Sequence, residues 1–285
     1  MAKKVVITAD STCDLSAELV ERYGVKIVPL YVNLDGTMYR DGVDAKPQMI
    51  FDLFEDKKIL PKTSAPAVQD YIDHFTQYLD GETEIVHISL SSEMSASCQN
   101  ANLAAGEIGE GVYVVDSRNL STGIGHIVIE AVERAAQGMP ASQIKEECEK
   151  LTDLVEASFV ISNLVFLYKG GRCSATSALM GTALNIKPGI VVKDGKMGVA
   201  KKYRGPFEKC LVKYVADQLQ GRDDIDTRRI FITRSSATPK ADEVVLAEIK
   251  KYVDFEEVYY TYAGCTICGH CGPDTLGILF MRKPE

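Results

Sequence analysis

The chain has 285 residues, of which 46% are hydrophobic and 25% are charged, and its formal net charge is −8 at pH 7. These proportions are typical of a soluble globular protein, and the negative charge argues against nucleic acid as a partner, because such binding needs a basic surface. No apolar run reaches the roughly 18 residues of a transmembrane segment, and the opening Met-Ala-Lys-Lys leads into a strand pattern instead of a signal-peptide core. We therefore expect a cytoplasmic protein.

Strands and helices alternate through the first half of the chain. Short runs rich in valine and isoleucine are typical of strands buried on both faces of a parallel sheet. In chain order we expect strands from residue 5 and at 26–34, 84–90 and 112–116, and helices at 15–23 (N-cap Asp14, stop Gly24), 47–56, 67–79, 95–107, 122–137 (started by Ser121) and 142–156 (capped by Ser142). This alternation indicates an α/β fold with helices on both faces of a parallel sheet.

The pattern changes after about residue 157. Asp194-Gly195 between two short apolar runs predicts a β-hairpin over 190–200. Further strands are expected at 159–162, 229–234, 258–262 and 275–281, with helices at 206–219 and 240–253. This order indicates an α+β unit with a mixed or antiparallel sheet. We therefore predict two domains, residues 1–157 and 158–285.

Five of the predicted strands end in loops that carry hydroxyl side chains. In open α/β sheets, ligands bind just beyond the carboxyl ends of the strands. The loops therefore predict a site that holds oxygen atoms with neutral donors, although the loops after Ile161 and Ile232 are interpreted as turns and caps. The segments are 5–12, 86–92, 112–117, 159–162 and 230–236.

The familiar nucleotide and hydrolase motifs are absent. The chain contains no G-x-x-x-x-G-K-[ST], no G-x-G-x-x-G directly after a strand and no G-x-S-x-G. Asp10 and Asp14 could bind Mg²⁺ as a carboxylate pair, but a helix cap explains Asp14 more simply. Nucleotide, hydrolase and Mg²⁺ sites are all disfavoured.

Three cysteines stand close together as Cys265-x2-Cys268-x2-Cys271, with His270 inside the run. The spacing resembles an incomplete iron–sulfur motif that lacks its fourth cysteine. Thiols in a loop explain the run more simply than a metal does. A metal or redox protein that uses these cysteines remains an alternative.

A combination of polar loops carries the strongest signal. Pro61-Lys-Thr-Ser-Ala-Pro66 is a rigid loop with two hydroxyls, and Ser91-Ser-Glu-Met-Ser95 brings three more to a helix N-terminus. His270 stands before Gly272-Pro273, close to the final strand. Neutral donors together with one titratable cation suit a carboxylate ligand. An alternative from another class is a small-molecule hydrolase or kinase that acts through Asp10, Ser95 and His270.

These motifs together resemble the DegV family, the fatty-acid-binding proteins that include the acyl-binding subunit of bacterial fatty acid kinase. The resemblance covers essentially the whole chain, and the motifs occur in the family's order. They are Asp10-Ser11-x-x-Asp14, Thr63-Ser64-x-Pro66, Leu90-Ser-Ser-x-x-Ser95, Val115-Asp-Ser117 with Ser121-x-Gly123-x-Gly125, Lys169-Gly-Gly-Arg-x-Ser174, Leu184-Asn-Ile-Lys-Pro188, Arg204-Gly205 and His270-x-Gly-Pro273.

The resemblance implies two α/β domains with a long-chain fatty acid (C16–C18) between them, no cofactor, no metal and no catalytic residue. It implies that an ATP-dependent acyl kinase subunit is the partner that phosphorylates the bound acid. The carboxylate would be bound by Thr63, Ser95, Ala96 and His270, and the residues near the head group or the partner would be Ser11, Ser64, Ser117, Arg172 and Arg204. From apolar runs beside the motifs we expect the acyl chain to contact Phe166, Leu179, Met180, Leu184 and Ile278.

The chain departs from the family pattern in two places. Ser95-Ala96-Ser97 replaces the usual S-G-T, so Ala96 lacks the conformational freedom of glycine where the backbone would approach the carboxylate. The cysteine run around His270 is the second departure.

Overall fold

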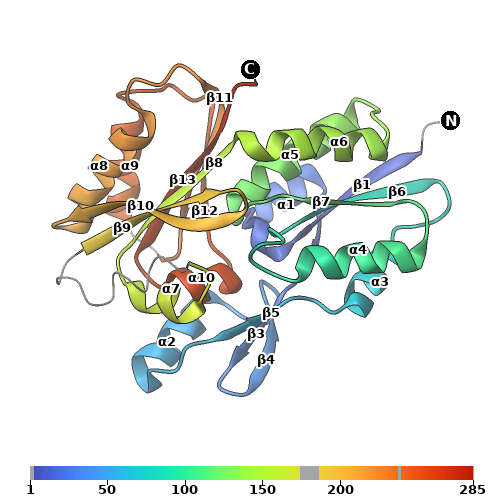
Figure 1. Ribbon diagram of the computed structural model, residues 1–285, viewed down its shortest axis with the longest axis horizontal. Coiled ribbons are helices and arrows are strands. Elements are labelled where there is room, and N and C mark those ends of the chain that lie inside the picture. Colours follow the sequence, from blue (N-terminus) through green and yellow to red (C-terminus); the bar gives the residue numbers. More distant parts are fainter. Residues whose placement is uncertain (1–2, 174–185, 237–238, 285) are drawn as a thin grey trace.

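A four-stranded and a six-stranded sheet lie side by side and form the frame of the molecule (Figure 1). The computed structural model describes residues 3–173, 186–236 and 239–284. The first sheet is entirely parallel and has the order β2-β1-β6-β7. Its strands are β1 (Lys4–Asp10), β2 (Lys26–Val28), β6 (Thr83–Ser89) and β7 (Val112–Asp116).

The second sheet is mixed and has the order β10-β9-β8-β13-β11-β12. Only β11 and β12 pair in parallel, and the other neighbours are antiparallel. Its strands are β8 (Val155–Ile161), β9 (Ile186–Lys193), β10 (Lys196–Arg204), β11 (Ile225–Arg234), β12 (Glu257–Tyr262) and β13 (Thr275–Arg282). The predicted α/β fold class, with a parallel first sheet and a mixed second sheet, is confirmed.

Helices cover both faces of the first sheet because its strands bury side chains on both sides. Ile85 of β6 packs against α3 and α4, whereas Val86 and Ile88 pack against α5 and α6. This is the alternation of a doubly covered strand. The helices are α1 (Ala17–Tyr23), α3 (Val68–Thr76), α4 (Ser97–Ile108), α5 (Thr122–Ala136) and α6 (Ala141–Leu151).

Helix α5 joins the two sheets. It packs on β1 and β6 and also on β8 and β13, and its first ten residues are all buried. One hydrophobic core therefore runs from Val86 in the first sheet to Phe231 and Leu279 in the second. A separate core on the far face of the second sheet is covered by α8 (Phe207–Leu219) and α9 (Pro239–Ile249). The division of the chain near residue 157 stays a prediction.

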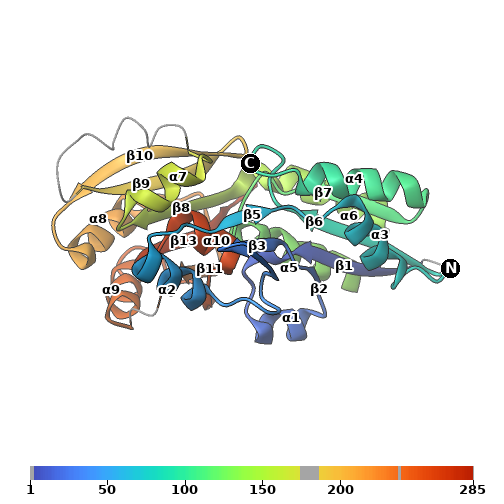
Figure 2. The ribbon, with the colours of Figure 1, turned by 90° about the horizontal axis from the view of Figure 1, so that it is seen from below.

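A small antiparallel sheet from the first half of the chain packs against helices of the second half. Its order is β4-β3-β5, and in both views it lies beside α10 (Figure 1, Figure 2). Val32, Ile50, Phe166 and Cys268 share one buried cluster there. The elements are β3 (Tyr31–Leu34), β4 (Thr37–Arg40), β5 (Lys62–Ser64), α2 (Pro47–Lys57), α7 (Leu164–Gly170) and α10 (Cys265–Cys271).

Most of the predicted elements begin and end within a few residues of their expected bounds, but two spans were wrong and β4, β5, α7 and α10 were not predicted. Residues 62–64 and 265–271, which were expected in loops, form β5 and α10. The predicted strand at 26–34 is broken at Pro29, which lacks a donor for the ladder, so that β2 and β3 belong to different sheets. The predicted helix at 142–156 begins at Ala141 without a Ser142 cap and ends at Leu151. A 3-10 turn over Thr152–Leu154 follows, and from Val155 the chain pairs with β13. Within the described ranges, no helix is long and apolar enough to cross a membrane.

Asp14 was predicted to cap α1, and that assignment is wrong. Ser16 is the N-cap, and its hydroxyl accepts from Leu19 N at 3.3 Å. Asp14 has a positive φ of 51° and directs its carboxyl group to Gly264, the residue just before α10. The predicted stop at Gly24 is confirmed, since this residue ends α1 in the left-handed region.

Candidate functional site

A cavity lies where the two sheets, β5 and α10 meet. It comprises about 880 Å³ of space between the atoms, including the part that is open to solvent. Much of its wall is apolar, and the side chains that form it come from both halves of the chain. They include Leu90, Met94, Phe159, Leu167, Met197 and Leu279.

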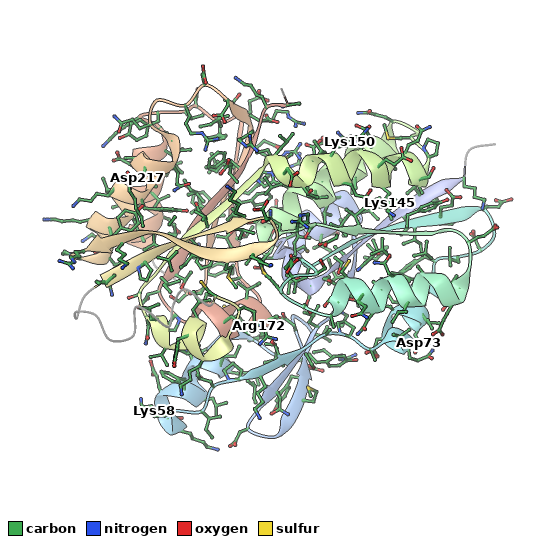
Figure 3. All side chains as sticks on the ribbon, in the orientation of Figure 1. Lys58, Asp73, Lys145, Lys150, Arg172 and Asp217 are labelled. Carbon is green, nitrogen blue, oxygen red and sulfur yellow. The ribbon has the colours of Figure 1, made fainter. Side chains whose placement is uncertain are left out.

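Polar side chains that the sequence predicted line part of this cavity. Thr63 and Ser64 reach it from β5, Ser95 from the loop before α4, and His270 from α10. Arg172 also lines it and is placed beside α10 in the side-chain view (Figure 3). The structure therefore brings together residues that are far apart in the sequence.

Thr63 and His270 form a direct hydrogen bond. Thr63 Oγ1 lies 2.8 Å from His270 Nε2. The other ring nitrogen, Nδ1, is buried and has no partner among the described residues. A proton on Nδ1 would leave a buried donor unsatisfied, so we assign the proton to Nε2. His270 then donates to Thr63, whose own hydroxyl proton stays available to an acceptor in the cavity.

His270 is uncharged at pH 7 in this structure. Burial, followed by the nearby charge of Arg172, lowers the pKa of the imidazole to about 4. The sequence interpretation treated His270 as a titratable cation, so it needs correction. The protein offers a neutral donor at this place, because desolvation penalises the imidazolium.

Gly170 at the end of α7 packs directly against the imidazole ring of His270. A Cβ atom at this position would lie 2.4 Å from His270 Nδ1, which is too close for any side chain. Glycine at position 170 therefore allows the imidazole to pack directly against the backbone of α7.

Ser95 stands at the start of α4. Its hydroxyl accepts from Ser97 N at 3.2 Å and lies 2.9 Å from Ser97 Oγ. Ala96 has φ −75° and ψ −2°, a conformation that alanine adopts without strain. The replacement of the family's glycine by Ala96 thus costs nothing in the backbone. Ala96 itself is exposed and is not among the described residues that line the cavity.

Three residues predicted near the head group lie outside the described lining. Ser11 Oγ accepts from Leu30 N, Ser117 Oγ bonds within its own loop, and Arg204 is exposed at the end of β10.

The predicted acyl-chain contacts need correction. Phe166 is buried in the cluster beside α2, and Ile278 packs under α8 and α9. Their neighbours Leu167 and Leu279 line the cavity instead, because adjacent side chains point to different faces. Leu179, Met180 and Leu184 lie outside the described residues.

Sequence reasoning missed a set of polar residues at the end of β11. Thr233, Arg234 and Ser235 line the cavity, as does Thr275 at the start of β13. Thr233, Arg234 and Ser235 belong to the segment after Ile232 that was interpreted as turns and caps, whereas Thr275 was not singled out. The hydroxyl pattern at the strand end was the signal that could have identified them.

The alternative of a hydrolase or kinase that acts through Asp10, Ser95 and His270 finds little support in the site. Asp10 is fully buried in the first sheet, where its oxygens accept from Tyr71, Ser89 and Leu90 at 2.6, 2.8 and 2.8 Å. Both of its oxygens are therefore occupied within the first sheet, and Asp10 is not among the described residues that line the cavity.

The cysteine run of α10 is not arranged as a metal centre. Burial raises the pKa of the Cys265 and Cys268 thiols, which disfavours the thiolate that a metal needs. Cys268 Sγ donates to Ala263 O at 3.3 Å. Across the described part of the chain, no group of three or more His, Cys, Asp or Glu side chains could hold a metal ion.

Comparison with known proteins gives a family match over nearly the whole chain. The sequence model described as "Uncharacterised protein, DegV family" matches residues 4–283. The chain belongs to the DegV family. The family membership expected from the sequence motifs is thereby confirmed.

Individual proteins match along nearly their full length. A DegV domain-containing protein of Caldanaerobacter subterraneus subsp. tengcongensis is 29% identical over 99% of this chain and 100% of its own. A solved DegV family protein of Thermus thermophilus, described by its fatty acid binding, is 31% identical, covers 98% of this chain and 99% of its own, and superposes with a TM-score of 0.88. A stearic acid-binding protein of Eubacterium ventriosum is 27% identical over 99% of both chains, with a TM-score of 0.83.

Proposed function

We propose that this chain binds a long-chain fatty acid in the cavity, with the carboxylate held by Thr63, Ser95 and His270. The observation that carries the proposal is the Thr63–His270 hydrogen bond on the wall of a cavity that is otherwise largely apolar. Fatty acid binding by the Thermus thermophilus relative and stearic acid binding by the Eubacterium ventriosum relative support it.

The two parts of the cavity have different tasks. Burying the roughly fifteen methylene and methyl groups of a C16 chain, at about 0.8 kcal/mol each, contributes on the order of 12 kcal/mol before the cost of association. Each hydrogen bond to the charged head group adds about 1.5–3 kcal/mol. The apolar wall therefore sets the affinity, while the hydroxyls fix the place of the carboxylate.

The carboxylate is recognised by neutral donors. His270 donates a hydrogen bond to Thr63, and the Thr63 hydroxyl in turn donates a hydrogen bond to the ligand carboxylate. A bound carboxylate favours the protonated imidazole, so it raises the pKa of His270 above its value of about 4 in this structure. Arg172 adds a positive charge at the same wall of the cavity.

The bound acid is presented to a separate kinase subunit that transfers the ATP γ-phosphoryl group to the carboxylate. The sequence carries neither G-x-x-x-x-G-K-[ST] nor G-x-G-x-x-G directly after a strand, which supports a carrier that leaves the phosphoryl transfer to its partner. In this proposal the chain alone, given ATP and palmitic acid, makes no acyl-phosphate. Addition of an acyl kinase subunit restores the product.

Lipid extraction tests the binding proposal directly. The purified chain is denatured, and the extract is analysed by mass spectrometry for C16–C18 acids. We expect a long-chain acid in the extract, and a rise in melting temperature when palmitic acid is added to delipidated protein. Absence of both results would contradict the proposed function.

A further inference from the structure

The first amides of α10 are bound by the carboxyl groups of two aspartates from the first half of the chain. Burial raises the pKa of Asp14 to about 8, so its carboxyl group is largely protonated at pH 7. Asp14 Oδ1 accepts from Gly264 N at 2.8 Å. Asp41 accepts from Cys265 N on Oδ1 at 2.6 Å and from Thr266 N on Oδ2 at 2.9 Å. Three consecutive amides that a helix start leaves without partners are thus satisfied by side chains more than 200 positions away in the sequence.

Both aspartate side chains are themselves held by further hydrogen bonds. Asp14 and Asp41 are only 5% and 2% exposed. Ser121 donates to Asp14 Oδ2 at 2.5 Å, and Ser11 donates to Asp41 Oδ2 at 3.4 Å. Each aspartate therefore has a set place in the first half of the molecule, from which it holds α10.

The fit around Gly264 is tight. A Cβ atom at this residue would lie 3.0 Å from Asp41 Oδ1 and 3.2 Å from Asp14 Oδ1. Helix α10 has only seven residues, and its other end brings His270 to Thr63. A displacement at the start of so short a helix therefore moves the imidazole.

We propose that Asp14 and Asp41 are positioning residues that hold His270 in its hydrogen bond to Thr63 and so set the preference of the cavity for a carboxylate head group. The inference rests on the proposed function, because it assigns these residues to the same binding site. Ser11, expected near the head group, acts in this inference by supporting Asp41.

The two aspartates should respond differently to replacement by asparagine. Both oxygens of Asp41 accept from backbone N–H groups, which cannot rotate. In Asp41→Asn the side-chain NH₂ group would therefore face one of these N–H groups, and that hydrogen bond would be lost. Asp14 has one backbone donor and one hydroxyl donor. In Asp14→Asn the Ser121 hydroxyl can turn and accept, so most of the arrangement is kept.

The experiment compares palmitic acid with 1-hexadecanol, which shares the alkyl chain but lacks the carboxylate. In delipidated full-length protein we expect Asp41→Asn to weaken binding of the acid by ~10-fold or more and of the alcohol by no more than about 2-fold. Asp14→Asn should lower the affinity for palmitic acid by at most about 3-fold, and Asp14→Ala should lower it by ~10-fold. Gly264→Ala is a second, milder variant that should lower the ratio of acid to alcohol affinity without removing either carboxylate.

Glu130→Gln is the matched control, because Glu130 is also a buried carboxylate but pairs with Arg134 and Arg229 away from the cavity. It should lower the melting temperature and leave the ratio of acid to alcohol affinity unchanged. A parallel loss of both ligands in Asp41→Asn would overturn the inference.

The imidazole nitrogen resonances of His270 provide a readout that needs no ligand. We expect them to shift in Asp41→Asn and to stay in place in Glu130→Gln. Unchanged resonances in Asp41→Asn would overturn the positioning role, whereas failure of the unmodified protein to bind palmitic acid would overturn the proposed function instead.

Discussion

Thr63 and His270 stand 207 positions apart in the sequence and are joined by a hydrogen bond of 2.8 Å between Oγ1 and Nε2. The bond links β5 of the small sheet to α10, which follows the last parallel strand of the second sheet. Residues of both halves of the chain thus share one hydrogen bond at the cavity, and the proposed function depends on it.

Removal of the Thr63 hydroxyl should weaken acid binding. Thr63→Val keeps the shape of the side chain but leaves the carboxylate without one charge-assisted donor, so we expect the affinity for palmitic acid to fall by ~10–100-fold. Thr8→Val is the matched control, since Thr8 Oγ1 lies 2.8 Å from His87 Nδ1 in a buried pair within the first sheet. The control should lose stability and retain affinity. Equal affinity losses in the two variants, measured by titration calorimetry, would contradict the assignment.

A methyl group at position 170 should disturb His270 without touching the ligand. Gly170→Ala places Cβ against Nδ1, and the imidazole must shift from the position in which it bonds to Thr63. We expect an affinity loss of ~10-fold for palmitic acid. Gly106→Ala serves as control, because an added Cβ there meets nothing within 4 Å. Retention of full affinity by Gly170→Ala would show that the position of His270 does not matter.

Neighbouring residues of β13 should separate acyl-chain contact from core packing. Leu279 lines the cavity, whereas Ile278 packs in the core under α8 and α9. Leu279→Ala should change the relative affinities for C14, C16 and C18 acids. Ile278→Ala should reduce the free energy of unfolding by about 2–5 kcal/mol and leave the order of chain-length preference as it was. A change of preference in Ile278→Ala alone would contradict the described lining.

The depressed pKa of His270 predicts a pH dependence of stability. The unfolded imidazole titrates near 6.5 and the folded one near 4, so the unfolded state binds more protons between these values. The free energy of unfolding therefore falls as the pH drops from about 6.5 to 4, by at most about 1.4 kcal/mol per pH unit from this group. In His270→Gln this contribution should vanish. Urea unfolding at several pH values measures it, and identical slopes in both proteins would show that His270 is not desolvated.

Much of the fold could be predicted from local sequence patterns. Runs such as Val112–Asp116 carry the β-branched signature of a buried strand, and Gly24 and the Asp194-Gly195 pair mark a helix end and a hairpin turn. The break at Pro29 was missed because an apolar run does not reveal which sheet each part joins. The helical periodicity also predicted that the helix near residue 141 continues to residue 156. Residues 155 and 156 instead pair with β13 as the start of β8.

The candidate site could be predicted only in part. Loop chemistry and family motifs indicated Thr63, Ser95 and His270, which all line the cavity. The pKa of His270 could not be predicted, because it depends on burial that the tertiary structure creates. Asp14 was assigned to a cap nearby in the sequence, whereas its partner Gly264 lies 250 positions away. Hydrogen bonds between residues this far apart in the sequence leave no periodic pattern from which they could be predicted.

The central claim is tested most directly by a crystal structure of the chain with palmitic acid. We predict the alkyl chain along Phe159, Leu167 and Leu279, with one carboxylate oxygen within hydrogen-bond distance of Thr63 Oγ1 and the Thr63–His270 bond intact. A carboxylate placed at Thr233 and Ser235 instead, or no acid in the cavity at saturating concentration, would contradict the account.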